Sequence, residues 1–263
     1  MLIESKSNQH VKRLRALATK KGRRTHRQFL VEGVRALEEA VDGRMAPVTV
    51  VICAELLAGT RAEKLAAQLA STGAELLHMS EEAFRAFSQV QSPEGVAAAL
   101  AIPDEKLETL SESDLFVAAV DLRDPGNMGT MLRTADAAGA GALIAAGSCA
   151  DIHDPKVTRA TAGSIFHLPA VTDVRAEEML DWARERGIST VAACMEGARP
   201  YTDIRYRVRT LVMVGNEANG LSPEVVKRAD LRAHVPMPGR AESLNVTVAA
   251  GILIWEILRQ RRI

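Results

Sequence analysis

Three polar loops in the second half of the chain each follow a short apolar run that reads as a buried strand. The loops belong to the segments 121–135, 212–221 and 236–246, and each carries glycine together with asparagine before a helix-like run begins. In open sheets of parallel strands, ligands bind at the carboxyl ends of the strands. Because all three loops combine Asn with Arg, Glu or Ser, they predict one composite site in one domain.

Strand-like and helix-like runs alternate through this half of the chain. Leu115–Val120 is apolar throughout, which is typical of a strand in a parallel sheet that is covered on both faces. Further strands are predicted at 142–146, 190–194, 210–214 and 234–235, with helices at 129–138, 154–162, 176–186 and 223–229. The alternation predicts a doubly wound α/β domain over residues 115–263.

The first half of the chain reads as a separate small α/β domain over residues 1–103. Its predicted strands are 29–31, 48–53, 75–79 and 95–102, and its predicted helices are 33–41, 61–71 and one that begins after Ser80 as N-cap. Residues 104–114 are polar and acidic and are predicted to link the two domains. Residues 246–262 are predicted to form a helix that is apolar nearly all round, which favours core packing together with a dimer contact.

The composition fits a soluble globular protein and argues against one mode of RNA binding. Hydrophobic residues make up 47% and charged residues 25% of the chain, which is enough to build a core. Aromatic residues make up only 3%, so a platform that stacks bases on exposed Phe or Tyr is not expected. The formal net charge is zero and by itself indicates no nucleic acid.

Charge is nevertheless distributed unevenly, because residues 1–28 form a basic arm. They hold nine Lys and Arg against the single acid Glu4, so the rest of the chain carries the opposite net charge. Val11, Leu14 and Leu17 form one apolar stripe of a predicted basic helix with a loose continuation. A basic arm on an acidic body favours phosphate binding, and a solvated, partly disordered terminus is the alternative.

The three cysteines, Cys53, Cys149 and Cys194, are far apart in the sequence and form no C-x-x-C pair. Neither a zinc or other metal site nor a disulfide framework is expected. The N-terminus has no apolar signal core, and no apolar run approaches the length that spans a bilayer. A cytoplasmic protein without a membrane segment is predicted.

The three motifs, in this order, resemble the SpoU (TrmH) family of RNA ribose methyltransferases in the SPOUT superfamily. The resemblance covers residues 115–258, and in the first half 29–35 and 92–96 resemble the RNA substrate-binding domain that many of these enzymes carry. The family implies S-adenosylmethionine as cofactor and a ribose 2′-hydroxyl as methyl acceptor. It also implies a deep trefoil knot and a homodimer that forms through the C-terminal domain.

The resemblance implies catalytic roles for Asn127, Arg133, Glu217, Ser243 and Asn245. Arg133 is the key residue in the family, and because a guanidinium rarely gives up its proton, we predict that it acts as a fixed cation. Glu217 is predicted to neutralise Arg133 or to complement the sulfonium of the cofactor. Plain structural roles remain open: Asn127 and Ser243 as helix N-caps, and Arg133 in a surface salt bridge.

Further residues are implied to hold the cofactor or the RNA. The cofactor residues are Val214, Gly215, Asn216, Gly220, Val235, Met237, Ser243 and Leu244. The residues expected to contact RNA are Lys12, Arg13, Arg23, Arg24, Arg35 and Arg159. Arg159 lies in a polar, positive stretch with Thr161, for which a plain amphipathic helix is the alternative.

Three classes of function are compatible with these residues. The favoured class is a 2′-O-methyltransferase that acts on structured RNA, with large-subunit (23S) ribosomal RNA first and tRNA second. A non-catalytic RNA-binding protein is disfavoured, because all five catalytic residues are present together. Another nucleotide-using α/β enzyme is disfavoured, because the chain has no G-x-x-x-x-G-K-[ST] loop and no G-x-G-x-x-G loop after a strand.

Overall fold

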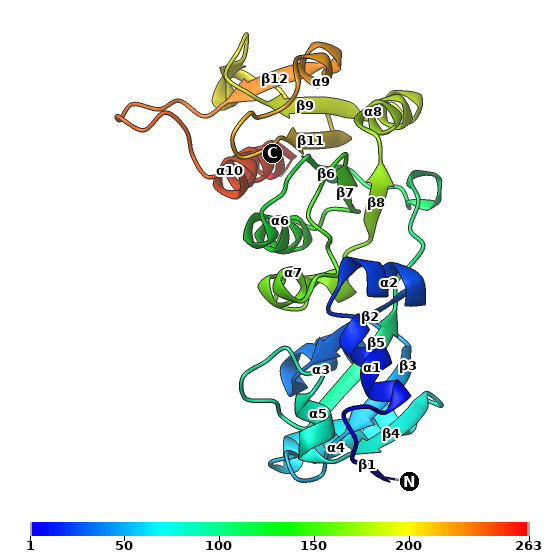
Figure 1. The fold of residues 1–263 in the computed structure, drawn as a ribbon. Helices are drawn as coiled ribbons and strands as arrows, with labels where there is room; N and C mark the ends of the chain where they lie inside the picture. Colours follow the sequence, from blue (N-terminus) through cyan, green and yellow to red (C-terminus); the bar gives the residue numbers. More distant parts are fainter. Residues whose placement is uncertain (1, 262–263) are drawn as a thin grey trace. The chain divides into compact units, whose positions relative to one another are not determined.

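The computed structural model describes residues 2–261, so Met1, Arg262 and Ile263 lie outside the described residues. The chain divides into two compact units. One contains the residues up to Pro103 together with His153–Phe166, and the other contains Asp104–Ile152 and the residues from His167 onward. Each unit is built of a sheet and helices, which confirms the predicted mixed α/β fold class (Figure 1).

The first unit is built on a five-stranded sheet in the order β1-β4-β3-β5-β2. Its strands are β1 (Leu2–Ile3), β2 (Gln28–Glu32), β3 (Pro47–Ile52), β4 (Glu75–Met79) and β5 (Val96–Ala101). Its helices are α1 (Gln9–Ala16), α2 (Lys20–His26), α3 (Val34–Asp42), α4 (Thr60–Ala70), α5 (Glu81–Arg85) and α7 (Pro155–Ala160). β5 runs antiparallel to β2 and β3, whereas β1, β3 and β4 are parallel. The four strands predicted in this half are confirmed.

The basic arm is folded into this unit. Val11, Leu14 and Leu17 are buried in a cluster on one face of the sheet, as the apolar stripe predicts. The predicted loose continuation is wrong, because residues 20–26 form α2. Thr19 begins that helix, since its side chain accepts a hydrogen bond from the backbone amide of Gly22 at 3.1 Å.

Ser80 is the N-cap of α5, as predicted, and its hydroxyl oxygen accepts a hydrogen bond from the backbone amide of Ala83 at 3.3 Å. We expect Ser80→Ala to lower the free energy of unfolding by about 1 kcal/mol, because one helix amide loses its acceptor. Urea denaturation measures this change. Ser92→Ala, at an exposed loop position of the same unit, is the control. Equal stability of the two variants would contradict the capping role.

The second unit is built on a seven-stranded parallel sheet in the order β10-β12-β9-β11-β6-β7-β8. Its strands are β6 (Leu115–Val120), β7 (Leu143–Ala146), β8 (Ala170–Val174), β9 (Ser189–Ala193), β10 (Arg199–Pro200), β11 (Thr210–Val214) and β12 (Leu231–His234). Its helices are α6 (Pro125–Ala137), α8 (Ala176–Glu185), α9 (Pro223–Arg228) and α10 (Val246–Arg261). The parallel sheet is confirmed, whereas β8 and β10 were not predicted because one is a partly exposed edge strand and the other has two residues.

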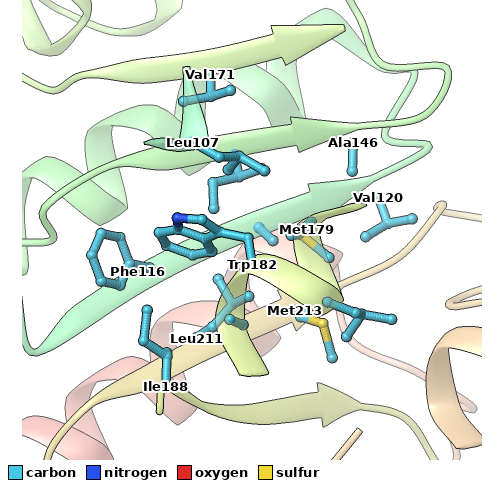
Figure 2. Packing of buried hydrophobic residues seen from close by; sticks show 14 of the residues in the cluster. Leu107, Phe116, Val120, Ala146, Val171, Met179, Trp182, Ile188, Leu211 and Met213 are labelled. Carbon is cyan, nitrogen blue, oxygen red and sulfur yellow. The ribbon is translucent and has the colours of Figure 1, made fainter. Parts of the chain in front are cut away.

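Helices cover both faces of this sheet, with α6 and α10 on one face and α8 and α9 on the other (Figure 1). On the α8 face, the rings of Trp182 and Phe116 meet edge to face, with centroids 5.2 Å apart (Figure 2). Leu107 and Leu110 are buried in the same cluster. The predicted linker 104–114 is therefore partly core.

The C-terminal helix α10 spans Val246–Arg261 in the described residues, and the predicted last residue, Arg262, lies outside them. Ala250, Leu253 and Ile257 are buried, as the predicted stripe requires, whereas Trp255 is half exposed. No helix in the part of the chain that the structure describes is long and apolar enough to cross a membrane.

The helix predicted at 154–162 forms as α7, but it does not join the helices of the second unit. Its segment packs in the first unit, where Phe29 contacts the rings of His153 at 4.6 Å and Phe166 at 6.5 Å between centroids. Asp154 accepts a hydrogen bond from the buried guanidinium of Arg23 at 3.3 Å. A local pattern identifies such a helix but not the sheet against which it packs.

Candidate active site

The carboxyl ends of β6, β11 and β12 place the three predicted loops at one edge of the second sheet. β6 and β11 are neighbours there; β7 and β8 continue the sheet from β6, and β9 and β12 continue it from β11. Where strand order reverses in this way, the loops diverge and leave a crevice in which open α/β sheets bind ligands. A cavity of about 820 Å³ lies at this edge, within the usual size of a small-molecule site.

The cavity gathers most of the residues predicted to be functional. The predicted cofactor residues Val214, Gly215, Asn216, Gly220, Val235 and Met237 line it. Leu244 lines it too, as do four of the predicted catalytic residues, Asn127, Glu217, Ser243 and Asn245. Residues that are more than a hundred positions apart in the sequence thus share one cavity.

The first loop turns into α6 at Asp124 and Pro125. The Asp124 carboxylate accepts a hydrogen bond from the backbone amide of Asn127 at 2.7 Å, and Pro125 occupies the first helical position. Asp124 is therefore the N-cap, and the alternative in which Asn127 caps the helix is wrong. The Asn127 side chain is available to the site because another residue caps the helix.

The side chains of Asn245, Asn127 and Glu217 form a directed chain of hydrogen bonds. Asn245 Nδ2 donates to Asn127 Oδ1 at 2.9 Å, and Asn127 Nδ2 donates to Glu217 Oε1 at 3.2 Å. One residue comes from each of the three loops. The network fixes both ends of the Asn127 amide and leaves the carboxylate as the final acceptor.

Glu217 also accepts a hydrogen bond from the backbone amide of Asp124 at 3.0 Å. Burial alone would raise the pKa of the Glu217 carboxyl, but the hydrogen bonds from backbone amides and from Asn127 hold this pKa below its usual range. The carboxylate is therefore charged at neutral pH. The structure describes no ion pair between Glu217 and Arg133 in residues 2–261, so that predicted pairing is absent within the chain.

The second loop is a tight turn closed by its own backbone. Asn216 and Gly220 exchange two backbone hydrogen bonds of 3.0 and 2.9 Å. A Cβ atom on Gly215 would lie 2.1 Å from the carbonyl carbon of Gly220 and 2.2 Å from the amide nitrogen of Leu221. Glycine is required at 215 because the turn folds back onto it.

The third loop joins β12 to α10. Asn245, not Ser243, begins α10, because Asn245 Oδ1 accepts hydrogen bonds from the Thr247 amide at 2.9 Å and the Thr247 hydroxyl at 2.6 Å. The predicted alternative role of Ser243 as N-cap is therefore wrong. Ser243 is exposed at the cavity.

The sequence interpretation missed the side of the cavity formed after β9 and by β12. Cys194, Glu196 and His234 line it, and His234 Nδ1 is buried without a hydrogen-bond partner in residues 2–261. The sequence does contain a signal for this side of the cavity, since residues 194–196 also follow a strand of the same sheet. A cavity of this size with a carboxylate, glycine backbone and an unsatisfied buried nitrogen fits a nucleoside-containing cofactor such as S-adenosylmethionine.

Arg133 does not line the cavity. It lies on α6 six residues after Asn127, which rotates it about 240° around the helix from that residue. Its side chain is exposed and makes no hydrogen bond or ion pair within residues 2–261, so the alternative role in a surface salt bridge receives no support. Arg133 is the one predicted catalytic residue that the chain does not bring to the cavity.

Arg13 and Arg23, two of the six predicted RNA-contacting cations, hydrogen-bond to groups of the first unit. Arg13 donates hydrogen bonds to Thr49 Oγ1 at 3.0 Å and to Glu75 Oε2 at 2.5 Å. Arg23 is only 2% exposed and donates to the Leu17 carbonyl at 3.0 Å and to Asp154. A buried guanidinium with these partners does not suit an RNA contact.

The remaining four cations, Lys12, Arg24, Arg35 and Arg159, are exposed on the same unit. Thr161, which was expected to face RNA beside Arg159, is fully buried. Its hydroxyl donates to the Thr158 carbonyl at 2.7 Å. The polar stretch 156–164 thus presents its cations Lys156 and Arg159 to solvent and buries its threonines Thr158 and Thr161.

Two protein-family models match the chain, one in each half. Residues 114–255 match the family model described as the SpoU rRNA Methylase family. Residues 8–98 match the family model described as the MRM3-like substrate binding domain.

Several known relatives match nearly the whole chain. The 23S rRNA (guanosine(2553)-2'-O)-methyltransferase RlmP of Bacillus subtilis is 35% identical over 97% of this chain and 98% of its own. The 23S rRNA (uridine(2479)-2'-O)-methyltransferase of Streptomyces viridochromogenes is 31% identical over 97% of this chain and 91% of its own. The AdoMet-bound rRNA methyltransferase of Sinorhizobium meliloti superposes with a TM-score of 0.89 at 32% identity, over 98% of this chain and 97% of its own.

Proposed function

This chain belongs to the SpoU rRNA methylase family, and we propose that it transfers a methyl group from S-adenosylmethionine to a ribose 2′-hydroxyl of large-subunit ribosomal RNA. The observation that carries this proposal is the hydrogen-bonded chain Asn245–Asn127–Glu217 at the cavity. A binding protein has no use for a charged carboxylate that is oriented by residues from three loops.

The cavity residues divide between holding the cofactor and orienting the reaction. S-adenosylmethionine supplies a methyl group on a positively charged sulfonium. Gly215, Gly220 and the side chains of Val235, Met237 and Leu244 line the cavity, which supports a role for them in enclosing the cofactor. The Glu217 carboxylate complements the positive charge, and Asn127, fixed at both ends, holds that carboxylate in place.

We assign Arg133 the role of a fixed cation that orients an RNA phosphate and stabilises the alkoxide that develops on the 2′-oxygen. The guanidinium keeps its proton at neutral pH, so it is not the base. The proton of the 2′-hydroxyl leaves through the phosphate, water or a neighbouring residue.

The substrates of the relatives that match nearly the whole chain favour ribosomal RNA over tRNA. The 23S rRNA methyltransferases of Bacillus subtilis and Streptomyces viridochromogenes match more than nine-tenths of this chain and of themselves, whereas the 23S rRNA methyltransferase RlmB of Pseudomonas aeruginosa matches 60% of this chain. A solved structure described by 2-OH methylation of C/U34 on tRNA matches only 56% of this chain, with a TM-score of 0.52. The match to the Bacillus subtilis and Streptomyces viridochromogenes enzymes includes the first half of the chain, and we propose that residues 1–103 bind RNA and 115–263 carry the reaction. Acting on ribosomal RNA, the enzyme would work in the cytoplasm.

We propose that exposed cations of the first unit bind phosphate groups of the RNA backbone. Deleting residues 1–28 would remove Val11, Leu14 and Leu17 from the core, so substitution is the cleaner test. The double variant Lys12→Ala/Arg24→Ala is expected to reduce the slope of log K against log salt by about 1.5, since each lost phosphate contact contributes about 0.7–0.9. Filter binding measures it, with Arg175→Ala/Arg184→Ala as control. Equal slopes for the two double variants would contradict the RNA-binding role.

We propose a homodimer through α10. The apolar side chains of Trp255 and Val248 are 50% and 49% exposed and lie seven residues apart, on one face of α10. Trp255→Glu is expected to shift the mass measured by light scattering from dimer to monomer, because it places a charge in an apolar interface. Leu76→Glu, at an exposed apolar position of the first unit, should remain dimeric. A dimeric Trp255→Glu protein would contradict this interface.

The proposed function is tested by transfer of labelled methyl groups. The purified protein is incubated with labelled S-adenosylmethionine in three separate reactions. These contain large-subunit ribosomal RNA, large-subunit particles or tRNA, each from cells that lack the protein. Label in the ribosomal RNA, free or in particles, is the expected result, and label only in tRNA would select the second substrate. Cofactor binding without label in any RNA would favour the non-catalytic RNA-binding protein.

A further inference from the structure

Asp121, the first residue after β6, has no assigned role, yet its backbone is held in an unusual conformation. Its φ angle is +54°, in the left-handed region that residues other than glycine seldom adopt and that Asp and Asn tolerate best. The carboxylate accepts a hydrogen bond from the Ser148 amide at 2.7 Å, and the Asp121 amide donates to the Ala146 carbonyl at 3.0 Å. A Cβ on Gly147 would lie 2.5 Å from the Asp121 carboxylate oxygen. The end of β6 is therefore locked against the end of β7.

This conformation presents the Asp121 carbonyl oxygen to the second loop. Asn216 Nδ2 donates a hydrogen bond to this oxygen at 3.0 Å and a second one to Glu217 Oε2 at 3.3 Å. Glu217 Oε1 is held separately, by the Asp124 amide and Asn127. Both oxygens of the carboxylate are thus oriented, and one of them depends on Asn216.

The two ends of the Asn216 side chain have different tasks. Its Oδ1 accepts hydrogen bonds from the amides of Ala218 at 2.9 Å and Asn219 at 3.3 Å, which shapes the turn. Its Nδ2 takes no part in closing the turn, and within residues 2–261 it hydrogen-bonds only to Asp121 and Glu217. The donor end can therefore be removed while the acceptor end, and with it the cofactor-lining turn, is kept.

We propose that Asp121 and Asn216 are positioning residues that form a brace, in which the left-handed backbone of Asp121 and the amide of Asn216 fix Glu217 beside Asn127. This inference rests on the proposed methyl transfer, and it changes the predicted role of Asn216 from cofactor binding to orientation of Glu217. Asp121 acts through Asn216, and neither residue needs to touch the RNA or the methyl group.

The variant Asn216→Asp separates orientation from cofactor binding. It keeps the acceptor for the Ala218 and Asn219 amides but replaces the donor with an oxygen that faces the Asp121 carbonyl and Glu217. The brace predicts that kcat for RNA methylation falls about 10- to 100-fold, as for a misplaced catalytic group, while the Kd for S-adenosylmethionine changes less than about threefold. Gln68→Glu makes the same amide-to-carboxylate change at an exposed position of α4, outside the cavity, and is the matched control, with small changes in both constants. A weaker Kd at unchanged kcat, or no change at all, would overturn the brace.

A pair of Asp121 variants tests the proposed role of Asp121 in the brace. Asp121→Asn keeps both the acceptor for Ser148 and the tolerance for a positive φ, so it should retain most of the turnover. Asp121→Ala loses both and should lose about tenfold in kcat at similar cofactor affinity. Equal turnover in the two variants would contradict a role for Asp121.

Crystal structures of the wild-type and Asn216→Asp proteins judge the brace independently of turnover. The brace predicts that Glu217 leaves Asn127 in the variant while the backbone hydrogen bonds between Asn216 and Gly220 persist. A Glu217 carboxylate that stays within hydrogen-bond distance of Asn127 would overturn it. If the wild-type protein methylates no RNA, the proposed function fails, and these structures still decide whether the brace exists.

Discussion

Arg133→Ala is expected to lower kcat for RNA methylation about 100- to 1,000-fold, the usual effect of removing one group that stabilises developing negative charge. The Kd for S-adenosylmethionine should stay within about twofold of wild type, because Arg133 lies outside the cavity of its own chain. Isothermal titration calorimetry measures the cofactor affinity, and single-turnover methyl transfer measures the chemical step.

Arg133→Lys sharpens this prediction. It keeps the positive charge but removes the planar fork that binds a phosphate through two parallel hydrogen bonds, so most of the turnover should still be lost. Arg184→Ala, at an exposed cation on α8, is the control for loss of a surface charge. A near-wild-type rate in either Arg133 variant would remove this residue from the mechanism.

Gly215→Ala is expected to weaken cofactor binding about 10- to 100-fold, which corresponds to the strain of overpacking a tight site. The added methyl group would lie 2.2 Å from the Gly220 carbonyl oxygen, so the backbone of the turn must move. Calorimetry with S-adenosylmethionine measures the loss, and thermal unfolding shows whether the rest of the protein stays folded.

Gly239→Ala is the matched control, because a Cβ at that position of the third loop meets no atom within 4 Å. Its cofactor affinity should remain close to that of the wild-type protein. If both glycine variants bind the cofactor equally well, the second loop is not part of the cofactor site.

The sequence predicted two of the three strands that build the site, because each of the two is a short apolar run that ends at glycine or a polar residue. The third strand, β12, was predicted at 234–235 but spans Leu231–His234, where polar and apolar residues alternate. Leu115–Val120 and Thr210–Val214 were predicted with the bounds that the structure has. The carboxyl ends of these strands then placed Asn127, Glu217 and Asn245 at one edge, and the structure brings these residues into one network.

Long-range packing accounts for what the sequence did not predict. In the sequence, Arg23 does not differ from the other cations of the basic arm. Its structural role comes from its hydrogen bonds to Asp154 and to the Leu17 carbonyl. α7 has the pattern of a surface helix, which is equally compatible with either unit. The role of Asp124 as N-cap has a local signal, since Asp is favoured at the N-cap and Pro at the first position of a helix.

The central claim, that the cavity directs a methyl group to a ribose oxygen, is tested most directly by locating that methyl group in the product. Labelled large-subunit ribosomal RNA is digested to nucleosides and analysed by mass spectrometry, with alkaline hydrolysis in parallel. We predict one 2′-O-methylated nucleoside and one alkali-resistant dinucleotide, both absent with Arg133→Ala. A methyl group on a base, with complete alkaline cleavage of the labelled RNA, would contradict the proposed function.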